Sequence, residues 1–166
     1  LVLNSDDPPG SSGLSQAQVD YLTKATKEND KVRWTIVALH KPIWTGNVEK
    51  NRFEQVEKAL NGRNYTVFAG HVHRYQKFVR QGMNYYQLAT TGGGSRLRGT
   101  KYGEFDHIAW VTMKKSGPVI ANVMLDGILP ENLQLPESTE PGVARDIQVT
   151  HPARAILYRE GVPLTG

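Results

Sequence analysis

The sequence has no cysteine, so its 166 residues form neither a disulfide nor a thiolate metal site. It also has no long apolar run. None approaches the roughly 20 residues that a helix needs to cross a bilayer, and no membrane segment is expected. Neither an initiator methionine nor a basic, apolar leader opens the chain. Leu1-Val2-Leu3-Asn4 resembles a strand entered partway, so we expect the native protein to begin upstream.

Clustered positive charge is missing as well. The net charge is +4, but lysine and arginine are spread along the chain, and no nucleic-acid-binding motif is found. A modest basic excess suits an anionic small substrate. The hydrophobic content of 39% and the charged content of 22% are typical of an ordinary globular domain.

The first half of the sequence has the pattern of an α/β fold. A helix is predicted over residues 16–28, with Ser15 as N-cap, Gln18 completing a capping box and Leu14 beside it in a hydrophobic staple. A nearly continuous apolar strand follows at 34–39. The remaining elements of this half are a helix at about 52–61, ended by Gly62, and a strand at 65–69.

After residue 73 the pattern changes to short, mostly antiparallel strands near 74–80, 84–89, 105–113 and 118–125. In the third of these, the residues from Phe105 to Met113 alternate between two faces. Both faces carry apolar side chains, so both are expected to be covered.

Three segments are predicted. Residues 1–128 form the main domain, and 129–146 form a linker rich in proline, glutamate and serine. Residues 147–166 have a strand-turn-strand pattern. Because about 20 residues cannot close a core of their own, they are expected to be the start of a truncated second β domain.

Three of the five histidines follow buried strands. His40 ends one strand, and His71 and His73 come just after another, where open α/β sheets place their ligands. Residues i and i+2 of an extended segment point the same way, and neutral imidazole is a common metal ligand. By itself, however, a His-x-His pair is common, and a strand-end histidine is more often structural.

The surrounding residues resemble a known family. TVFAGHVHRY at 66–75 is similar to the Gly-His-x-His motif of calcineurin-like metallophosphoesterases, which include the purple acid phosphatases. IVALHKPIW at 36–44 resembles the histidine motif that precedes it, and residues 14–22 resemble the helix ahead of that strand. The resemblance covers about residues 1–125 in the expected order.

The resemblance implies the C-terminal half of a metallophosphoesterase α/β/β/α sandwich, with a mixed sheet and antiparallel strands. His40 and His71 would bind one metal ion and His73 a second, the pair being divalent or trivalent Fe, Mn or Zn. The expected function is hydrolysis of a phosphoric ester. The family's earlier motifs, Asp-x-His, Gly-Asp and Gly-Asn-His-Asp/Glu, are absent. They are expected in a missing N-terminal half, without which this chain is expected to be inactive.

The residues that would bind substrate or protonate the leaving group are not identified by the sequence. Lys50 and Arg52 are the only cations offered by the loop after the first histidine motif. The Gly92-Gly93-Gly94 run can cradle a phosphate with backbone N–H groups, but a plain loop is favoured because no helix follows. His107 is expected to be a hydrogen-bonded structural residue.

Two other functions stay open. One is a non-catalytic binding or envelope-surface module on a degenerate phosphoesterase fold, and the other is a structural protein holding a single metal ion through three histidines. The segment 158–164 resembles transthyretin-like and carboxypeptidase-regulatory-like β domains. Such domains are frequent outside the cytoplasm, which slightly favours an extracytoplasmic location.

Overall fold

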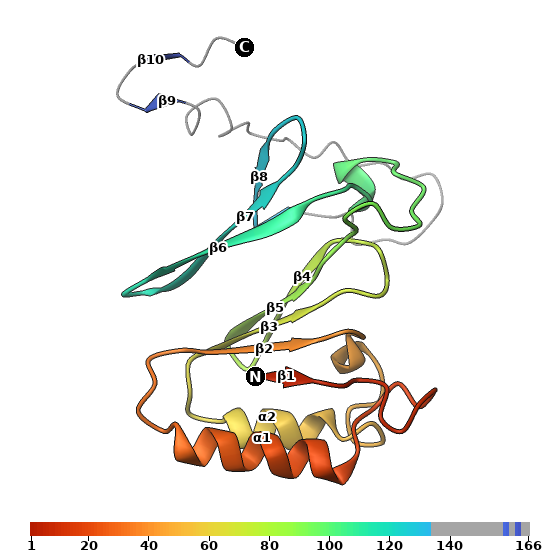
Figure 1. Ribbon diagram of the computed structural model, residues 1–166, viewed down its shortest axis with the longest axis vertical. Helices are drawn as coiled ribbons and strands as arrows, with labels where there is room; N and C mark the ends of the chain where they lie inside the picture. Colours follow the sequence, from red (N-terminus) through yellow and green to blue (C-terminus); the bar gives the residue numbers. More distant parts are fainter. Residues whose placement is uncertain (134–157, 160–161, 164–166) are drawn as a thin grey trace. The chain divides into compact units, whose positions relative to one another are not determined.

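The computed structural model describes residues 1–133, 158–159 and 162–163 (Figure 1). The chain divides into two compact units: the first contains residues 1–72 and 77–88, and the second contains residues 73–76 and those from Ala89 onward. Most of the predicted linker and of the trailing β segment lies outside the described residues. The domain boundaries therefore stay a prediction. Among the described residues, no helix is long and apolar enough to span a membrane.

A five-stranded sheet organises the first unit, with the strands in the order β1-β2-β3-β5-β4. They are β1 (Val2–Leu3), β2 (Thr35–Leu39), β3 (Tyr65–Ala69), β5 (Met83–Gln87) and β4 (Gln76–Arg80). The pairs β1–β2, β2–β3 and β3–β5 are parallel. β4 and β5 are joined by Gln81-Gly82, both with positive φ, the turn geometry that connects antiparallel strands. The predicted mixed α/β sheet is confirmed.

Two helices, α1 (Gln16–Glu28) and α2 (Phe53–Leu60), cover one face of this sheet (Figure 1). Ser15 caps α1 as predicted, because its hydroxyl accepts a hydrogen bond from the Gln18 N–H. The predicted capping box is only half formed. The Gln18 side chain accepts instead from the Asn4 N–H at 3.1 Å, and so connects the helix to the end of β1.

The core of the first unit lies between the helices and the sheet. α1 contributes Val19 and Leu22, and α2 contributes Phe53, Val56 and Leu60. A 3₁₀ turn at Ile43–Thr45 adds buried apolar side chains to the same cluster. Burial of this apolar surface holds the helices against the sheet, and the backbone pairing of β2 with β3 sets the register of their carboxyl ends.

One charged group is buried in the first unit. Glu57 of α2 is 3% exposed and receives hydrogen bonds from the Arg80 guanidinium and the Tyr85 hydroxyl. The Tyr85 and Tyr65 hydroxyls lie 2.9 Å apart. Burial raises the pKa of both phenols above the ordinary value.

The second unit contains a three-stranded antiparallel sheet of β6 (Ile108–Lys114), β7 (Gly117–Val123) and β8 (Ile128–Pro130). β8 was not predicted, and it takes in the first two residues of the predicted linker. A 3₁₀ turn spans Thr100–Tyr102. β9 (Tyr158–Arg159) and β10 (Val162–Pro163) form a separate antiparallel pair.

The two faces of the β6–β8 sheet differ. One face is buried, with Ile120, Asn122 and Leu129 in its interior. The opposite face presents Trp110, which is 62% exposed, and Ile108, which is 52% exposed. The expectation that both faces of this strand are covered is therefore wrong. Strand alternation shows that both faces are apolar, but it does not show whether anything packs on them.

Candidate metal centre

The candidate site is built from the carboxyl ends of β2 and β3. His40 is the residue after β2, and Gly70-His71 follow β3. Because the two strands are parallel, both segments leave the sheet at the same edge. The Gly70 N–H donates to the His40 carbonyl at 3.0 Å, which continues the strand pairing to the histidines themselves.

The structure brings His40 and His71 together. His40 Nε2 and His71 Nδ1 lie 3.0 Å apart, with the two rings nearly perpendicular at 78°. Both side chains are exposed rather than packed in the apolar core. The separation of the two nitrogens is the distance of a hydrogen bond between the two rings. Neighbouring nitrogens bound at about 2.1 Å are separated by about 3.0 Å on an octahedral ion and by about 3.4 Å on a tetrahedral zinc ion. The two nitrogens therefore lie close enough to become neighbouring ligands of one ion in place of the hydrogen bond.

The backbone of the histidine segment is unusual. His71 and His73 both have positive φ, 69° and 58°. Left-handed conformations are uncommon for residues other than glycine, and strained residues gather at functional sites. Two such residues in three positions, both histidines, point to a segment whose conformation is held for the placement of its side chains.

His73 belongs to the second unit and makes a different contact. Its Nδ1 lies 2.5 Å from the carbonyl oxygen of Gly94. Metal-binding histidines commonly donate their second ring N–H to a backbone carbonyl in this way, which leaves the other nitrogen available as a ligand. From the sequence, the Gly92–Gly94 run was expected to be a plain loop, with a phosphate cradle as the alternative, and neither expectation includes this contact.

Polar groups from the segment after β1 reach the residue next to His40. The Lys41 N–H donates to the buried hydroxyl of Ser5 at 2.7 Å. The Lys41 ammonium donates to Asp6 at 2.8 Å and holds the pKa of that carboxyl below its ordinary value. Asp6 is thus paired with a cation. Across residues 1–133, no group of three His, Cys, Asp or Glu side chains is placed to hold a metal ion.

The other sequence candidates have structural contacts. His107 is buried, with Nδ1 2.9 Å from Asn122 Oδ1 and Nε2 accepting from the Ala89 N–H, so the expected structural role is confirmed. Burial lowers the pKa of His107. Arg52 donates to the Leu14 carbonyl at 2.9 Å, which ties it to the scaffold. Lys50 is exposed.

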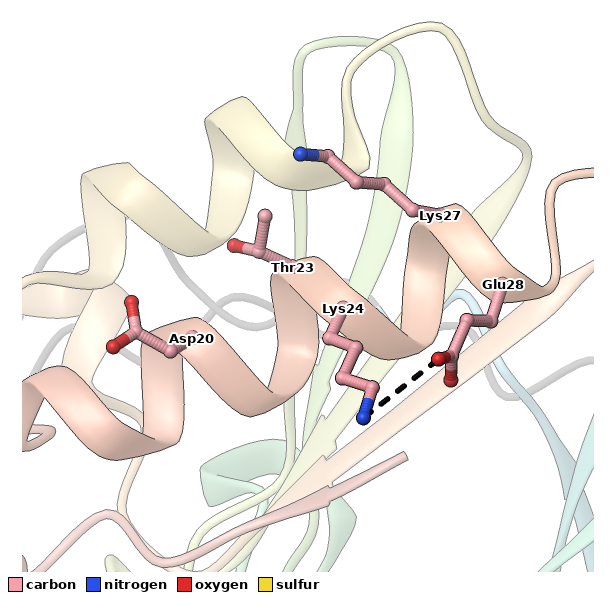
Figure 2. Close-up of a pocket in the computed structure, with 5 residues that line it drawn as sticks. All are labelled: Asp20, Thr23, Lys24, Lys27 and Glu28. Carbon is pink, nitrogen blue, oxygen red and sulfur yellow. Dashed lines mark ion pairs between the residues drawn. The ribbon is translucent and has the colours of Figure 1, made fainter.

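The surface of α1 has a hollow that contains none of the candidate histidines. It is lined by Asp20, Thr23, Lys24, Lys27 and Glu28, all from one helix (Figure 2). Lys24 and Glu28 form an exposed ion pair at 3.8 Å. Residues of both charges along a single helix do not converge on a ligand, and this surface is a solvated helix face.

No family model matches the chain. No curated protein matches it either. A solved structure of a conserved uncharacterized protein from Streptococcus pneumoniae TIGR4, described as a predicted phosphoesterase, is 11% identical, and the similarity covers 87% of this chain and 93% of that one. The TM-score is 0.26. A likeness this low carries no weight for fold or function.

Proposed function

We propose that this chain is part of a metal-dependent phosphoric-ester hydrolase. In this proposal His40 and His71 are ligands of one metal ion, and His73 is a ligand of a second. The observation that carries it is the 3.0 Å separation of His40 Nε2 and His71 Nδ1 at the carboxyl ends of two parallel strands. The resemblance of residues 36–44 and 66–75 to metallophosphoesterase motifs supports the same assignment.

The donor chemistry fits the proposed ions in part. Imidazole nitrogens are common ligands of Zn, Fe and Mn. A pair of such ions, when bound, holds phosphoryl oxygens and lowers the pKa of a bound water. Three imidazoles supply too few ligands and no negative charge for two cations, so we propose that the missing ligands, including a bridging carboxylate, come from sequence upstream of Leu1.

The contribution of this chain is the placement of the nitrogens. The β2–β3 pairing, extended by the Gly70 N–H bond to the His40 carbonyl, sets the spacing of His40 and His71. Because both rings are exposed, a phosphate ester can approach them without rearrangement of the core. Ligands that already lie next to each other lower the entropic cost of completing the site.

Zinc titration tests the assignment of the first pair. The whole 166-residue chain, labelled with ¹⁵N in its histidines, is titrated with Zn²⁺ and followed at the imidazole nitrogens by NMR. We expect His40 Nε2 and His71 Nδ1 to shift together, and the shift at His40 to be lost in His71→Ala. Lys24→Ala, on the outer surface of α1, is the control and should bind as the unmodified chain does.

The same titration separates the competing functions. Zinc binding that persists unchanged in His40→Ala and His71→Ala would contradict the proposal. A single tight ion that shifts all three histidines at one equivalent would favour a structural protein with one metal ion. Absence of any shift at His40 and His71 up to millimolar Zn²⁺ would favour a non-catalytic module.

A further inference from the structure

The hydrogen bond between His73 and Gly94 decides which nitrogen of His73 carries the proton. A carbonyl oxygen can only accept, so the 2.5 Å contact requires a hydrogen on Nδ1. In the neutral ring the lone pair is then on Nε2. The backbone at Gly94 thereby selects one tautomer and orients the ring.

The loop that provides this carbonyl is tied down by Asp106. The Asp106 carboxylate accepts hydrogen bonds from the Thr90 hydroxyl and, at 3.0 Å, from the Gly92 N–H. These two bonds hold the pKa of Asp106 below its ordinary value, so the carboxylate stays charged at neutral pH. The neighbouring His107 fixes the loop further: its N–H donates to the Thr90 carbonyl at 2.9 Å.

Gly93 lies where the loop passes close to the His73 ring. A Cβ at this position would lie 3.4 Å from His73 Cε1 and 3.4 Å from Thr90 Cγ2. Cε1 is bonded to both ring nitrogens, so such a methyl group would touch the ring at the lower limit of ordinary van der Waals contact. A Cβ at Gly94 would meet no atom within 4 Å, and the residue next to it thus offers a matched control.

We infer that Asp106 is a positioning residue for His73. Through Thr90 and Gly92 it holds the loop from Thr90 to Gly94 so that the Gly94 carbonyl keeps His73 as its Nδ1–H tautomer, with Nε2 available to a cation. The inference deepens the proposed function and rests on it only for the identity of what binds Nε2. It assigns roles to residues that the family resemblance does not mark.

The tautomer of His73 is measured first, in the metal-free chain. With ¹⁵N-histidine labelling, long-range proton–nitrogen NMR spectra distinguish a protonated Nδ1 from a protonated Nε2. We expect His73 to show Nδ1–H alone in the unmodified chain and a mixture of both tautomers in Asp106→Ala. Asp106→Asn, which keeps an acceptor oxygen, should restore most of the Nδ1–H form.

The buried His107 ring reports in the same spectra whether the second unit stays folded. Its Nδ1 is held by Asn122 and its Nε2 by the Ala89 N–H. The inference is overturned if Asp106→Ala leaves both the His107 signals and the His73 tautomer unchanged. If Asp106→Ala disturbs His107, Thr90→Val removes one of the two bonds to the carboxylate and is judged by the same criterion.

Zinc binding at His73 then connects the tautomer to ligand binding. Asp106→Ala is expected to weaken Zn²⁺ binding, followed at His73 Nε2, by about 10- to 100-fold, the usual effect of losing an outer partner of a ligand. Gly93→Ala, which adds a contact to the ring, should change the affinity more than Gly94→Ala does. An unchanged affinity in Asp106→Ala would overturn the role of the loop in ligand binding. A fixed tautomer with no zinc at Nε2 would instead contradict the proposed function and leave the positioning intact.

Discussion

Arg80 donates two hydrogen bonds to the Glu57 carboxylate, from Nε at 2.7 Å and from Nη2 at 3.1 Å. The pair joins α2 to β4, which are separated in the sequence by β3. Tyr85 donates a third hydrogen bond to the same carboxylate at 3.2 Å. Glu57 is nearly inaccessible to water, so its charge depends on these partners.

Removing this charge is expected to destabilise the chain. Glu57→Gln leaves the Arg80 guanidinium without its carboxylate and should lower the free energy of unfolding in urea by about 3 kcal/mol. Glu54→Gln is the control, because it breaks an exposed ion pair with Lys58 on the same helix and should cost at most about 0.5 kcal/mol. Equal costs for the two variants would show that Glu57 is not buried in solution.

Alkaline pH should destabilise the second unit through Tyr75. Burial raises the pKa of Tyr75 to about 12, whereas an unfolded tyrosine ionises near pH 10. Between these values the unfolded chain loses a proton that the folded chain keeps, so the free energy of unfolding falls as pH rises. The loss from this group approaches about 3 kcal/mol.

Urea unfolding of Tyr75→Phe between pH 8 and pH 12 measures that contribution. The variant loses the hydrogen bond from the Tyr75 hydroxyl to the Glu131 carbonyl, which should cost about 1 kcal/mol at neutral pH. Its stability should nevertheless fall less steeply above pH 10 than that of the unmodified chain. Tyr21→Phe controls for removal of an exposed hydroxyl. Parallel pH profiles for Tyr75→Phe and the unmodified chain would contradict the prediction.

Trp110 should be accessible to water, unlike Trp44, which is buried. The fluorescence difference between the unmodified chain and Trp110→Phe is expected to be red-shifted and readily quenched by acrylamide. Stability should change by less than about 0.5 kcal/mol, as for other surface substitutions. Trp44→Phe should remove a component that acrylamide quenches poorly. A protected, blue-shifted Trp110 would mean that the outer face of the β6–β8 sheet is covered in solution.

The isolated chain is expected to hydrolyse no phosphate ester. Two dications within roughly 4 Å need carboxylates to offset their charge, and the described residues contain no group of three His, Cys, Asp or Glu placed to hold even one ion. Turnover of an aryl phosphate monoester and diester by this chain, with added Mn²⁺, Zn²⁺ or Fe²⁺, should equal the blank. Metal-dependent turnover by this chain, lost in His71→Ala, would show that its ligand set is already complete.

The sequence predicted those features that depend on neighbouring residues or on sheet periodicity. Ser15 caps α1 because the N-cap interaction is local, and His40 meets His71 because the ends of parallel strands share an edge. The predicted capping box was wrong about the partner of the Gln18 side chain. That side chain binds the N–H of Asn4, which lies 14 positions away, and not the N–H of the N-cap residue. β8 was missed because three residues ending in Pro130 show no period.

Contacts between irregular segments could not be predicted, because such segments have no periodic pattern. His73 and Gly94 are 21 positions apart, with no repeating pattern between them to set their distance. The exposed position of Trp110 depends on what packs against a sheet face, which alternation along one strand does not encode. Similarly, the partner that allows Glu57 of α2 to be buried is the Arg80 guanidinium on β4, 23 positions away.

The strand order β3-β5-β4 limits how the histidine segment can vary in length. The chain leaves β3, passes over the place later filled by β5, and enters β4 two strand positions away. That span is about 9.6 Å, which needs about three extended residues. Positions 70 to 75 connect the two strands, so the connection has about twice the number of residues that the distance requires. The additional residues allow the backbone to include its two left-handed residues. Deletions within it would straighten the connection and remove those turns well before they shifted β4 from its place in the sheet.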